Sequence, residues 1–137
     1  MAKRGRKAIT SKAKKKKAVA RAVIKEGRGR ITINKRALET IEPNYVRTFI
    51  AEPLILAGEI AKTVDISVNV RGGGFMGQAV SARSAIAKAL VRYTKDKALE
   101  KTFREYDRLL LVDDPRQKES KKPLGRGARA KKQKSKR

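Results

Sequence analysis

The chain contains no cysteine, no histidine and no tryptophan, and only three tyrosines and three phenylalanines. Without cysteine, neither a disulfide nor a thiolate metal site can form. Without histidine, the usual general base and the commonest zinc ligand are missing, so we expect no catalytic residue and no metal site. No apolar run approaches the ~20 residues of a membrane-spanning helix, and the basic amino terminus lacks the apolar segment of a signal peptide. The protein is therefore predicted to be a non-enzymatic protein without a membrane partner.

Acidic residues are scarce as well, with 13 Asp and Glu against 37 Lys and Arg, a net charge of +24 over 137 residues. The excess lies at the ends: residues 1–30 carry +12 and residues 115–137 carry +10, while residues 31–114 carry only +2. Self-repulsion of this size opposes a compact isolated state, and a polyanion relieves it. RNA or DNA is the favoured partner because each neutralised phosphate releases counterions. Anionic membrane is disfavoured because the basic ends hold few bulky apolar groups.

The apolar pattern of the central part predicts an α/β domain with two layers, in which helices cover one face of a four-stranded sheet. Ala18, Ala20, Ala22 and Ile24 share one strand face, and Gly27 lies in a turn that would join this strand to the next as a hairpin. The predicted elements are strands over 18–25 and 31–33, a short helix capped by Asn34 and reaching residue 41, helices over 45–51 and 53–61, a strand over 63–70, helices over 75–93 and 96–107, and a strand over 109–112.

The composition divides the chain into a basic amino-terminal extension (1–17), a globular α/β domain (18–114) and an extended basic tail (115–137). The like-charge block Lys14–Lys17 is expected to be disordered or extended without a partner. Pro123, Gly125 and Gly127 oppose regular structure in the tail, which we expect to become ordered only when phosphates replace water around its cations.

Gly72, Gly74 and Gly77 spell G-x-G-x-x-G between a predicted strand and a predicted helix. A dinucleotide site also needs a βαβ unit of about 30 residues whose second strand ends in an acidic residue about 20 positions after the glycines. Here the residue at that distance is Asp96, inside helical sequence, and the next apolar strand is predicted only from Leu109. That mismatch disfavours a nucleotide, so we expect no cofactor. Two compatible interpretations remain: a tight strand-to-helix turn, and backbone amides at a helix start that bind a phosphate of RNA. The charge of the chain favours adding the phosphate to the turn.

Two further features each allow two interpretations. The predicted helix 75–93 presents Lys88, Arg92 and, just beyond it, Lys95 on its outward stripe, either as solvated charge or as contacts to a partner. Asp113 and Asp114 precede Pro115, where turn chemistry is favoured over a metal site because two adjacent carboxylates rarely define one.

Several segments jointly resemble one family. The segments are GRGRITINKRALE, EPLILAGEIAKTVDISV, VRGGGFMGQAVSARSAIAKALV and LLLVDDPRQKESKKPLGRGARAKKQKSKR, and together the match runs from about Ala18 to Arg137. They resemble the universal ninth-protein family of the small ribosomal subunit, and the form of the tail is closer to its archaeal and eukaryotic branch. The resemblance implies a fold like domain two of the fifth small-subunit ribosomal protein, with an early hairpin and a left-handed βαβ crossover.

The resemblance also implies a function: a structural constituent of the small-subunit head that binds small-subunit rRNA, neighbours other head proteins, forms no obligate homo-oligomer and acts in the cytoplasmic ribosome. Its tail would reach the anticodon stem-loop of the P-site tRNA through Lys134, Ser135, Lys136 and Arg137. Relatives often carry an aromatic residue at the positions of Lys132 and Lys136, so here contact would rest on charge and on arginine planes. Arg137 is the expected contact, with Lys136 as a second candidate. The alternative function is a general DNA- or RNA-compacting protein outside the ribosome.

The candidate rRNA-binding residues share a cationic side chain or a place in the glycine turn. They are Lys14, Lys15, Lys16, Lys17, Arg28, Arg30, Arg36, Arg71, Gly72, Gly73, Gly74, Arg83, Arg116, Lys121, Lys122, Arg126, Arg129, Lys131 and Lys132.

Overall fold

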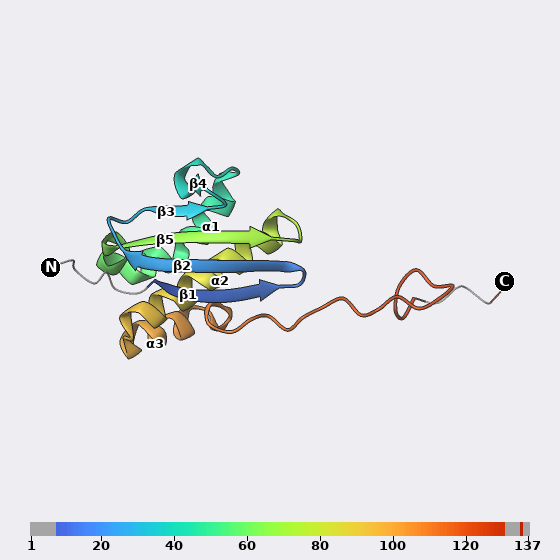
Figure 1. Cartoon of the computed structure of the whole chain (residues 1–137). Helices are drawn as coiled ribbons and strands as arrows, with labels where there is room; N and C mark the ends of the chain where they lie inside the picture. The colour runs from blue at the N-terminus through green and yellow to red at the C-terminus, as the bar shows by residue number, and fades with distance from the viewer. Residues whose placement is uncertain (1–7, 131–134, 136–137) are drawn as a thin grey trace.

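The computed structural model describes residues 8–130 and Ser135, and shows an α/β domain from which the carboxyl-terminal tail extends (Figure 1). Its elements are β1 (Ile9–Lys15), β2 (Ala18–Glu26), β3 (Ile31–Ile33), β4 (Arg36–Ala37), η1 (Leu38–Thr40), α1 (Asn44–Ala57), η2 (Gly58–Thr63), β5 (Val64–Arg71), α2 (Phe75–Thr94), α3 (Lys97–Tyr106) and η3 (Arg108–Leu110). The two-layer α/β class is confirmed, with five strands in place of the predicted four. No helix in the described part of the chain has the length and apolar character needed to cross a bilayer.

The sheet has the strand order β1-β2-β5-β3-β4. Strand β5 lies between β2 and β3, antiparallel to the first and parallel to the second. The predicted hairpin between residues 18–25 and 31–33 is therefore wrong, because the turn at Gly27 leads over the end of β5 instead of back along β2. Asp65 at the start of β5 holds that turn by accepting hydrogen bonds from the amides of Arg28 and Arg30, both at 2.9 Å.

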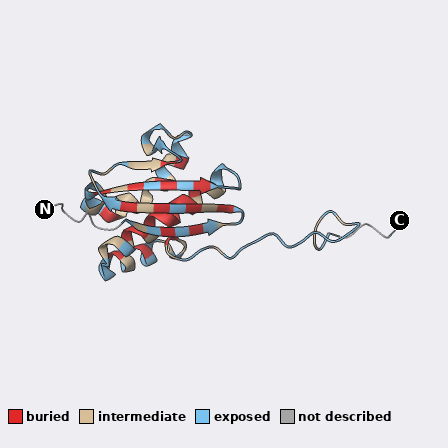
Figure 2. Ribbon diagram, in the orientation of Figure 1, coloured by how far each residue is buried: buried red, intermediate tan, exposed pale blue. Residues whose placement is uncertain are grey.

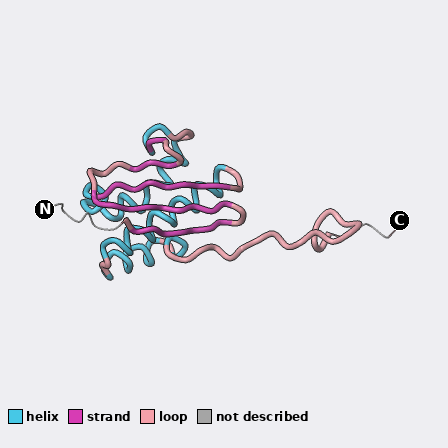
Figure 3. Tube along the Cα trace, viewed as in Figure 1, coloured by secondary structure: helices cyan, strands magenta, loops and turns pink. Residues whose placement is uncertain are grey.

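The connection between the parallel neighbours β3 and β5 runs through α1. In Figure 1 both strands point to the right, β5 lies below β3, and the helices lie behind the sheet. This arrangement makes the crossover left-handed, against the usual right-handed rule. The tube in Figure 3 shows the same two layers, with strands in one and helices in the other.

Strand β1 lies within the segment assigned from sequence to the amino-terminal extension. It pairs with β2 along its whole length, from Ile9 opposite Ile24 to Lys15 opposite Ala18. Its two buried positions, Ser11 and Ala13, hold small side chains, and the Ser11 hydroxyl donates to the Ala85 carbonyl oxygen of α2 at 2.7 Å. A strand with this few apolar residues gives only a weak periodic signal, which the surrounding lysines hide.

Helix α2 forms where the 3.6-residue period predicted it, and its inward face packs on β1, β2 and β5. Figure 2 shows this buried face against alternating buried positions on the strands, as expected for a sheet covered on one side. Helix α1 runs through Pro53, where the sequence predicted two helices. Its buried residues Val46, Ile50, Pro53 and Ala57 form one stripe toward the core, and their burial outweighs the hydrogen bond that proline cannot donate.

Two further element predictions are wrong. The apolar run 109–112 was expected to be a strand, but residues 108–110 form the 3-10 turn η3, which places Leu110 fully in the core. Asn34 does not cap a helix; it has a left-handed backbone (φ 49°), and its side-chain oxygen accepts from the Val70 amide at 2.8 Å. The fixed left-handed turn at Asn34 instead directs the chain into β4.

Candidate nucleic-acid interface

A cationic hollow of about 690 Å³ opens where β1 ends, β2 begins and β5 turns into α2. Its lining combines the lysine turn (residues 14–17), the glycine turn (residues 72–74) and the first part of the tail. The lining residues are Lys14, Lys15, Lys16, Lys17, Val19, Gly73, Gly74, Gly77, Gln117 and Lys118. In Figure 1 these three segments meet at the right-hand end of the sheet, next to the point from which the tail leaves. Five lysines and no carboxylate around one hollow favour an anionic ligand.

The glycine turn is built by two residues with left-handed backbone, Gly72 (φ 77°) and Gly73 (φ 66°). A Cβ atom on Gly72 would lie 2.4 Å from the Lys17 carbonyl oxygen, and one on Gly73 would lie 3.1 Å from the Ala18 Cβ. Only glycine fits such positions without strain. The structure thus confirms the tight strand-to-helix turn, which rests against the turn between β1 and β2.

Gly74 differs from its neighbours. Its backbone is ordinary (φ −92°), and a Cβ atom there would meet nothing within 4 Å. It is the N-cap of α2, no side chain caps the helix start, and the first turn holds no acidic residue. The amides of this 20-residue helix therefore open toward the hollow, where a phosphate can accept their hydrogen bonds.

No strand follows α2 in the described part of the chain, so the second half of a dinucleotide-binding βαβ unit is missing there. The chemistry of the hollow suits a phosphate of a polyanion: amides supply fixed dipoles and lysines supply mobile point charges.

The lysine turn supplies most of that charge. Lys14, Lys16 and Lys17 are exposed, and none forms an ion pair with any residue that the structure describes. Lys16 itself lies in the left-handed region (φ 53°), which closes the tight turn between β1 and β2. Three cations within four positions repel one another, so an anion that binds between them removes that repulsion.

Unlike the other three lysines of this turn, Lys15 forms an ion pair within the described part of the domain. It holds the root of the tail, which we define as residues 114–116. Its ammonium group pairs with the Asp114 carboxylate, and Lys15 and Asp114 also form an isolated parallel bridge. Arg116 folds back on the same carboxylate, with Nε at 2.9 Å and Nη2 at 2.6 Å from Oδ2. Hydrogen bonds from Arg116, then from Lys15, hold the pKa of Asp114 far below its usual range. The tail therefore starts from a fixed point beside the hollow.

The adjacent Asp113 completes this attachment by forming an ion pair with Lys88 of α2, with Lys88 Nζ 2.6 Å from Asp113 Oδ1. The two carboxylates thus serve the turn before Pro115, in agreement with the favoured interpretation. No cluster of three or more potential metal ligands occurs within residues 8–130 or at Ser135.

Arg83 is a correction to the predicted site. It is only 5% exposed, and its guanidinium pairs with Glu52 Oε2 at 2.6 Å and with Asp107 Oδ2 at 2.9 Å, while stacking 4.5 Å from the ring centre of Phe49. Partial burial raises the pKa of Asp107, but the Leu109 amide and the Arg83 guanidinium outweigh burial and lower it overall. Arg83 joins α1, α2 and the start of η3 inside the domain, so an RNA backbone has no access to it.

The stripe of α2 that left two interpretations open also faces the protein itself. Lys88 Nζ donates to the Lys12 carbonyl oxygen at 3.1 Å, and Arg92 Nη1 donates to the Thr10 carbonyl oxygen at 3.0 Å. Both side chains therefore attach the edge strand β1 to the helix and are neither simply solvated nor directed at a partner.

The remaining predicted cations are exposed but scattered. Arg71 ends β5 next to the glycine turn, whereas Arg28 and Arg30 lie at the opposite end of the sheet. Arg36 lies on the far edge strand β4. The structure thus brings together the lysine turn, Arg71 and the glycine turn, and leaves the other three arginines apart.

The described part of the tail is loop throughout and extends away from the domain (Figure 3). Lys121, Lys122, Arg126 and Arg129 are its predicted contacts, and among them only Arg129 makes an ion pair within the described residues, 3.1 Å from Glu119. Ser135 is exposed, while the predicted contacts at Lys131, Lys132, Lys134, Lys136 and Arg137 lie outside the described residues.

Sequence reasoning missed Gln117 and Lys118, which line the hollow. Lys118 belongs to the basic tail, but no local pattern separates it from the other tail lysines. The attachment of Asp114 to Lys15, which brings Lys118 to the hollow, joins residues 99 positions apart.

A family model described as Ribosomal protein S9/S16 matches residues 13–137. The small ribosomal subunit protein uS9 of Methanothrix thermoacetophila is 54% identical over 129 residues, covering 94% of this chain and 98% of that protein. The uS9 proteins of Thermoplasma acidophilum and Thermoplasma volcanium are 55% and 51% identical, over 89% and 93% of this chain and 95% and 96% of their own lengths. The matched region includes the hollow, the glycine turn and the whole tail.

Proposed function

Because the chain belongs to the ribosomal protein S9/S16 family, we propose that its cationic hollow binds small-subunit rRNA and that its tail reaches the P-site tRNA. Members of this family are structural and non-enzymatic constituents of the small ribosomal subunit, and this chain acts in translation as part of the cytoplasmic ribosome. Its archaeal relatives agree with the branch that the form of the tail predicted.

The observation that carries the rRNA proposal is the meeting of the lysine turn with the open start of α2. Lys14, Lys16 and Lys17 have no ion pair within the described residues, and the helix start beside them has no side-chain cap. Phosphates of an RNA backbone would accept hydrogen bonds from the helix amides and neutralise the lysines in the same hollow.

The tail proposal follows from where the tail is attached and from what it carries. The Lys15–Asp114–Arg116 contacts hold its root beside the hollow, so tail and hollow would follow one continuous path of RNA. Beyond the root, lysines can act as point charges, while Arg126 and Arg129 can fork onto phosphate or stack on a base. We propose that Arg137, with Lys136 beside it, contacts the anticodon stem-loop of the P-site tRNA.

Removal of residues 118–137 tests the rRNA part and leaves the root contacts intact. The domain should keep its melting temperature, because the described residues of this segment are loop and add nothing to the core. Affinity for small-subunit rRNA should fall. The slope of log affinity against log salt should flatten by up to about 7, because ten cations are lost at ~0.7 each on single strands. An unchanged slope would rule out phosphate contacts by the tail.

Removal of Lys136 and Arg137 alone tests the tRNA part. Subunits containing this variant should assemble normally but bind P-site tRNA more weakly or initiate with lower fidelity. The double substitution Lys136→Arg/Arg137→Lys exchanges the order of the last two side chains, keeps the charge and serves as the control. Failure of subunit assembly would show instead that the tip has a structural role.

A further inference from the structure

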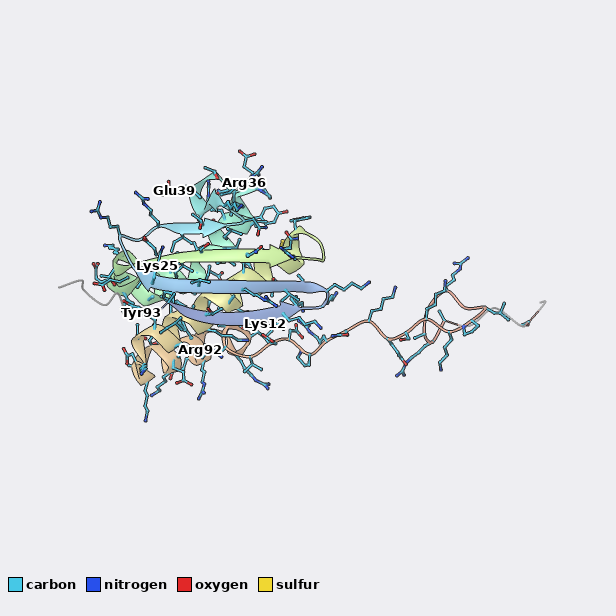
Figure 4. All side chains as sticks on the ribbon, in the orientation of Figure 1. Lys12, Lys25, Arg36, Glu39, Arg92 and Tyr93 are labelled. Carbon is cyan, nitrogen blue, oxygen red and sulfur yellow. The ribbon has the colours of Figure 1, made fainter. Side chains whose placement is uncertain are left out.

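The face of the sheet turned away from the helices is open. Residues that point to it alternate with the buried ones, and no described element packs over it. Figure 4 looks onto this face, with Lys12 labelled on β1 and Lys25 on β2. An exposed sheet face of five strands is a large surface without a covering layer.

Cations dominate this open face. They come from three neighbouring strands: Lys12 and Lys14 of β1, Arg21 and Lys25 of β2, and Arg71 of β5. Lys14 lies at the edge of this face, where it also lines the hollow. None of these five side chains forms an ion pair with a residue of the described chain. Asp65 is the acidic residue on the same strands' open face, and its Oδ1 already accepts the amides of Arg28 and Arg30, which lowers its pKa.

The pairing register places like charges directly opposite each other. Lys12 lies opposite Arg21 on the neighbouring strand, and such a pair destabilises an antiparallel sheet. Lys14 lies opposite Val19, which in turn lies opposite Arg71, so a second cationic row crosses the same three strands. A sheet with this arrangement gains stability when a polyanion lies across it.

Between the cationic positions runs a row of three hydroxyl side chains and one valine. Thr10, Val23, Ser67 and Thr32 follow one another across four strands in register. Lys25 lies on one side of this row, opposite Asp65 of β5, and Arg21 lies on the other side. The two cations are four residues apart along β2, which corresponds to about 13 Å. No aromatic side chain stands on the open face of β1, β2 or β5, all of which the structure describes in full, so unpaired bases have no ring to stack on there.

We infer that this open face binds the backbone of an RNA double helix across its shallow minor groove. Lys25 on one side of the row, and Lys12 and Arg21 on the other, contact the phosphates that flank the groove. The Thr10, Ser67 and Thr32 hydroxyls contact 2′-hydroxyl groups between them. The inference rests on the proposed function and deepens it: the hollow and the tail take the flexible part of the rRNA, while the sheet takes a helical part.

The test compares two variants of the full chain that lose equal charge. Lys12→Gln/Arg21→Gln/Lys25→Gln removes cations from the open face, and Lys97→Gln/Lys101→Gln/Arg108→Gln removes exposed cations from α3 and η3. The probes are an RNA duplex of about 16 base pairs and a poly(U) strand of equal charge. For the duplex, the salt slope of the open-face variant should be flatter than that of the control variant by about 2 to 3, because three phosphate contacts at ~0.7 to 0.9 each are lost.

Stability and poly(U) binding separate the outcomes. The open-face variant should melt at the same or a higher temperature, because the Lys12–Arg21 repulsion is gone, and its poly(U) binding should match that of the control variant. Equal duplex binding by the two variants would overturn the inference, as would a loss of binding that is confined to poly(U). If the wild-type chain neither binds rRNA nor joins small subunits, the proposed function itself fails, and the inference falls with it.

Discussion

Helix α2 and the lysine turn beside the hollow both carry lysine or arginine side chains. Those of α2 contact the protein itself, whereas three of the four in the lysine turn face solvent. In α2, Arg83 pairs with two carboxylates inside the domain, and Lys88 and Arg92 bind carbonyl oxygens of β1. At the rim, Lys16 and Lys17 are exposed and have no ion pair within the described part of the chain. What separates the cations that build the fold from those available to RNA is the burial of each side chain and its contacts with protein oxygens. The number of cations in a segment does not separate them.

The difference teaches where a net charge of +24 acts. Scarce carboxylates are placed where they fix structure: Glu52 and Asp107 hold Arg83, and Asp113 and Asp114 hold the root of the tail. The surplus of cations is thereby left to the surface, the lysine turn and the tail. Substitution of one member of this division at a time should separate folding stability from RNA affinity.

Arg83→Met should produce the largest loss of stability, about 3 kcal/mol, because it leaves two carboxylates without their buried counter-charge. Urea unfolding monitored by circular dichroism measures it. Arg104→Met removes an exposed partner of Glu100 and serves as the control, with an expected change below about 1 kcal/mol. Reduced rRNA affinity in fully folded Arg83→Met protein would contradict the inward role of this side chain.

The glycine turn contains the same contrast between a residue needed for the fold and a residue open to RNA, within three positions. Gly72→Ala should cost roughly 2 kcal/mol, because it combines a left-handed backbone with a Cβ atom 2.4 Å from the Lys17 carbonyl oxygen. Gly74→Val should leave stability within about 1 kcal/mol, since a Cβ atom there meets nothing within 4 Å. It should weaken rRNA binding if phosphates approach the start of α2. Thermal melts and filter binding of both variants separate the two roles, and normal rRNA affinity of Gly74→Val would argue against that approach.

Asp114→Asn should lower the melting temperature moderately at neutral pH by releasing the root of the tail. The pKa of Asp114 is depressed in the folded state, so its contribution is fully present above its unfolded pKa near ~4 and is lost as the pH falls through the folded value. The melting temperatures of variant and wild type should therefore converge below about pH 4. A difference that is constant from about pH 7 to about pH 2 would show that the ion pairs with Lys15 and Arg116 contribute nothing.

The smallest effects should come from single lysines, one largely buried and one exposed. Lys88→Gln should cost about 1 kcal/mol and leave the salt slope of rRNA binding unchanged, because this side chain is engaged with Lys12 and Asp113. Lys121→Gln should do the reverse, with no change in stability and a slope flatter by ~0.7. Swapped results for the two variants would overturn the division between inward and outward cations.

The elements with strong local periodicity were predictable. The alternation of Val64, Ile66, Val68 and Val70 predicts β5, and the 3.6-residue spacing through Ile86 and Leu90 predicts α2. Strand β1 was not predictable, because its two buried positions, Ser11 and Ala13, are small and its pairing with β2 supplies the order. The position of β5 between β2 and β3 was also missed, since non-local pairing leaves no mark in either strand.

The candidate site was predictable in its chemistry but only partly in its membership. The glycine turn and the lysine block stood out locally, and the structure brings them together. Arg83 looked like a free cation because its partners, Glu52 and Asp107, lie 31 and 24 positions away. Lys118 could not be singled out, because only the attachment of Asp114 to Lys15 brings it to the hollow.

The sequence by itself determined the charge, its concentration at the two ends, the absence of histidine and cysteine chemistry, and the glycine-rich turn between a strand and a helix. These are local properties, fixed by residue type and by spacing over a few positions. The tertiary structure decided which cations face inward, which carboxylates hold the tail, and that the lysine turn and the start of α2 share one hollow. Those outcomes depend on which distant segments pack together, because an ion pair or a hollow exists only once burial and sheet order have placed its parts side by side.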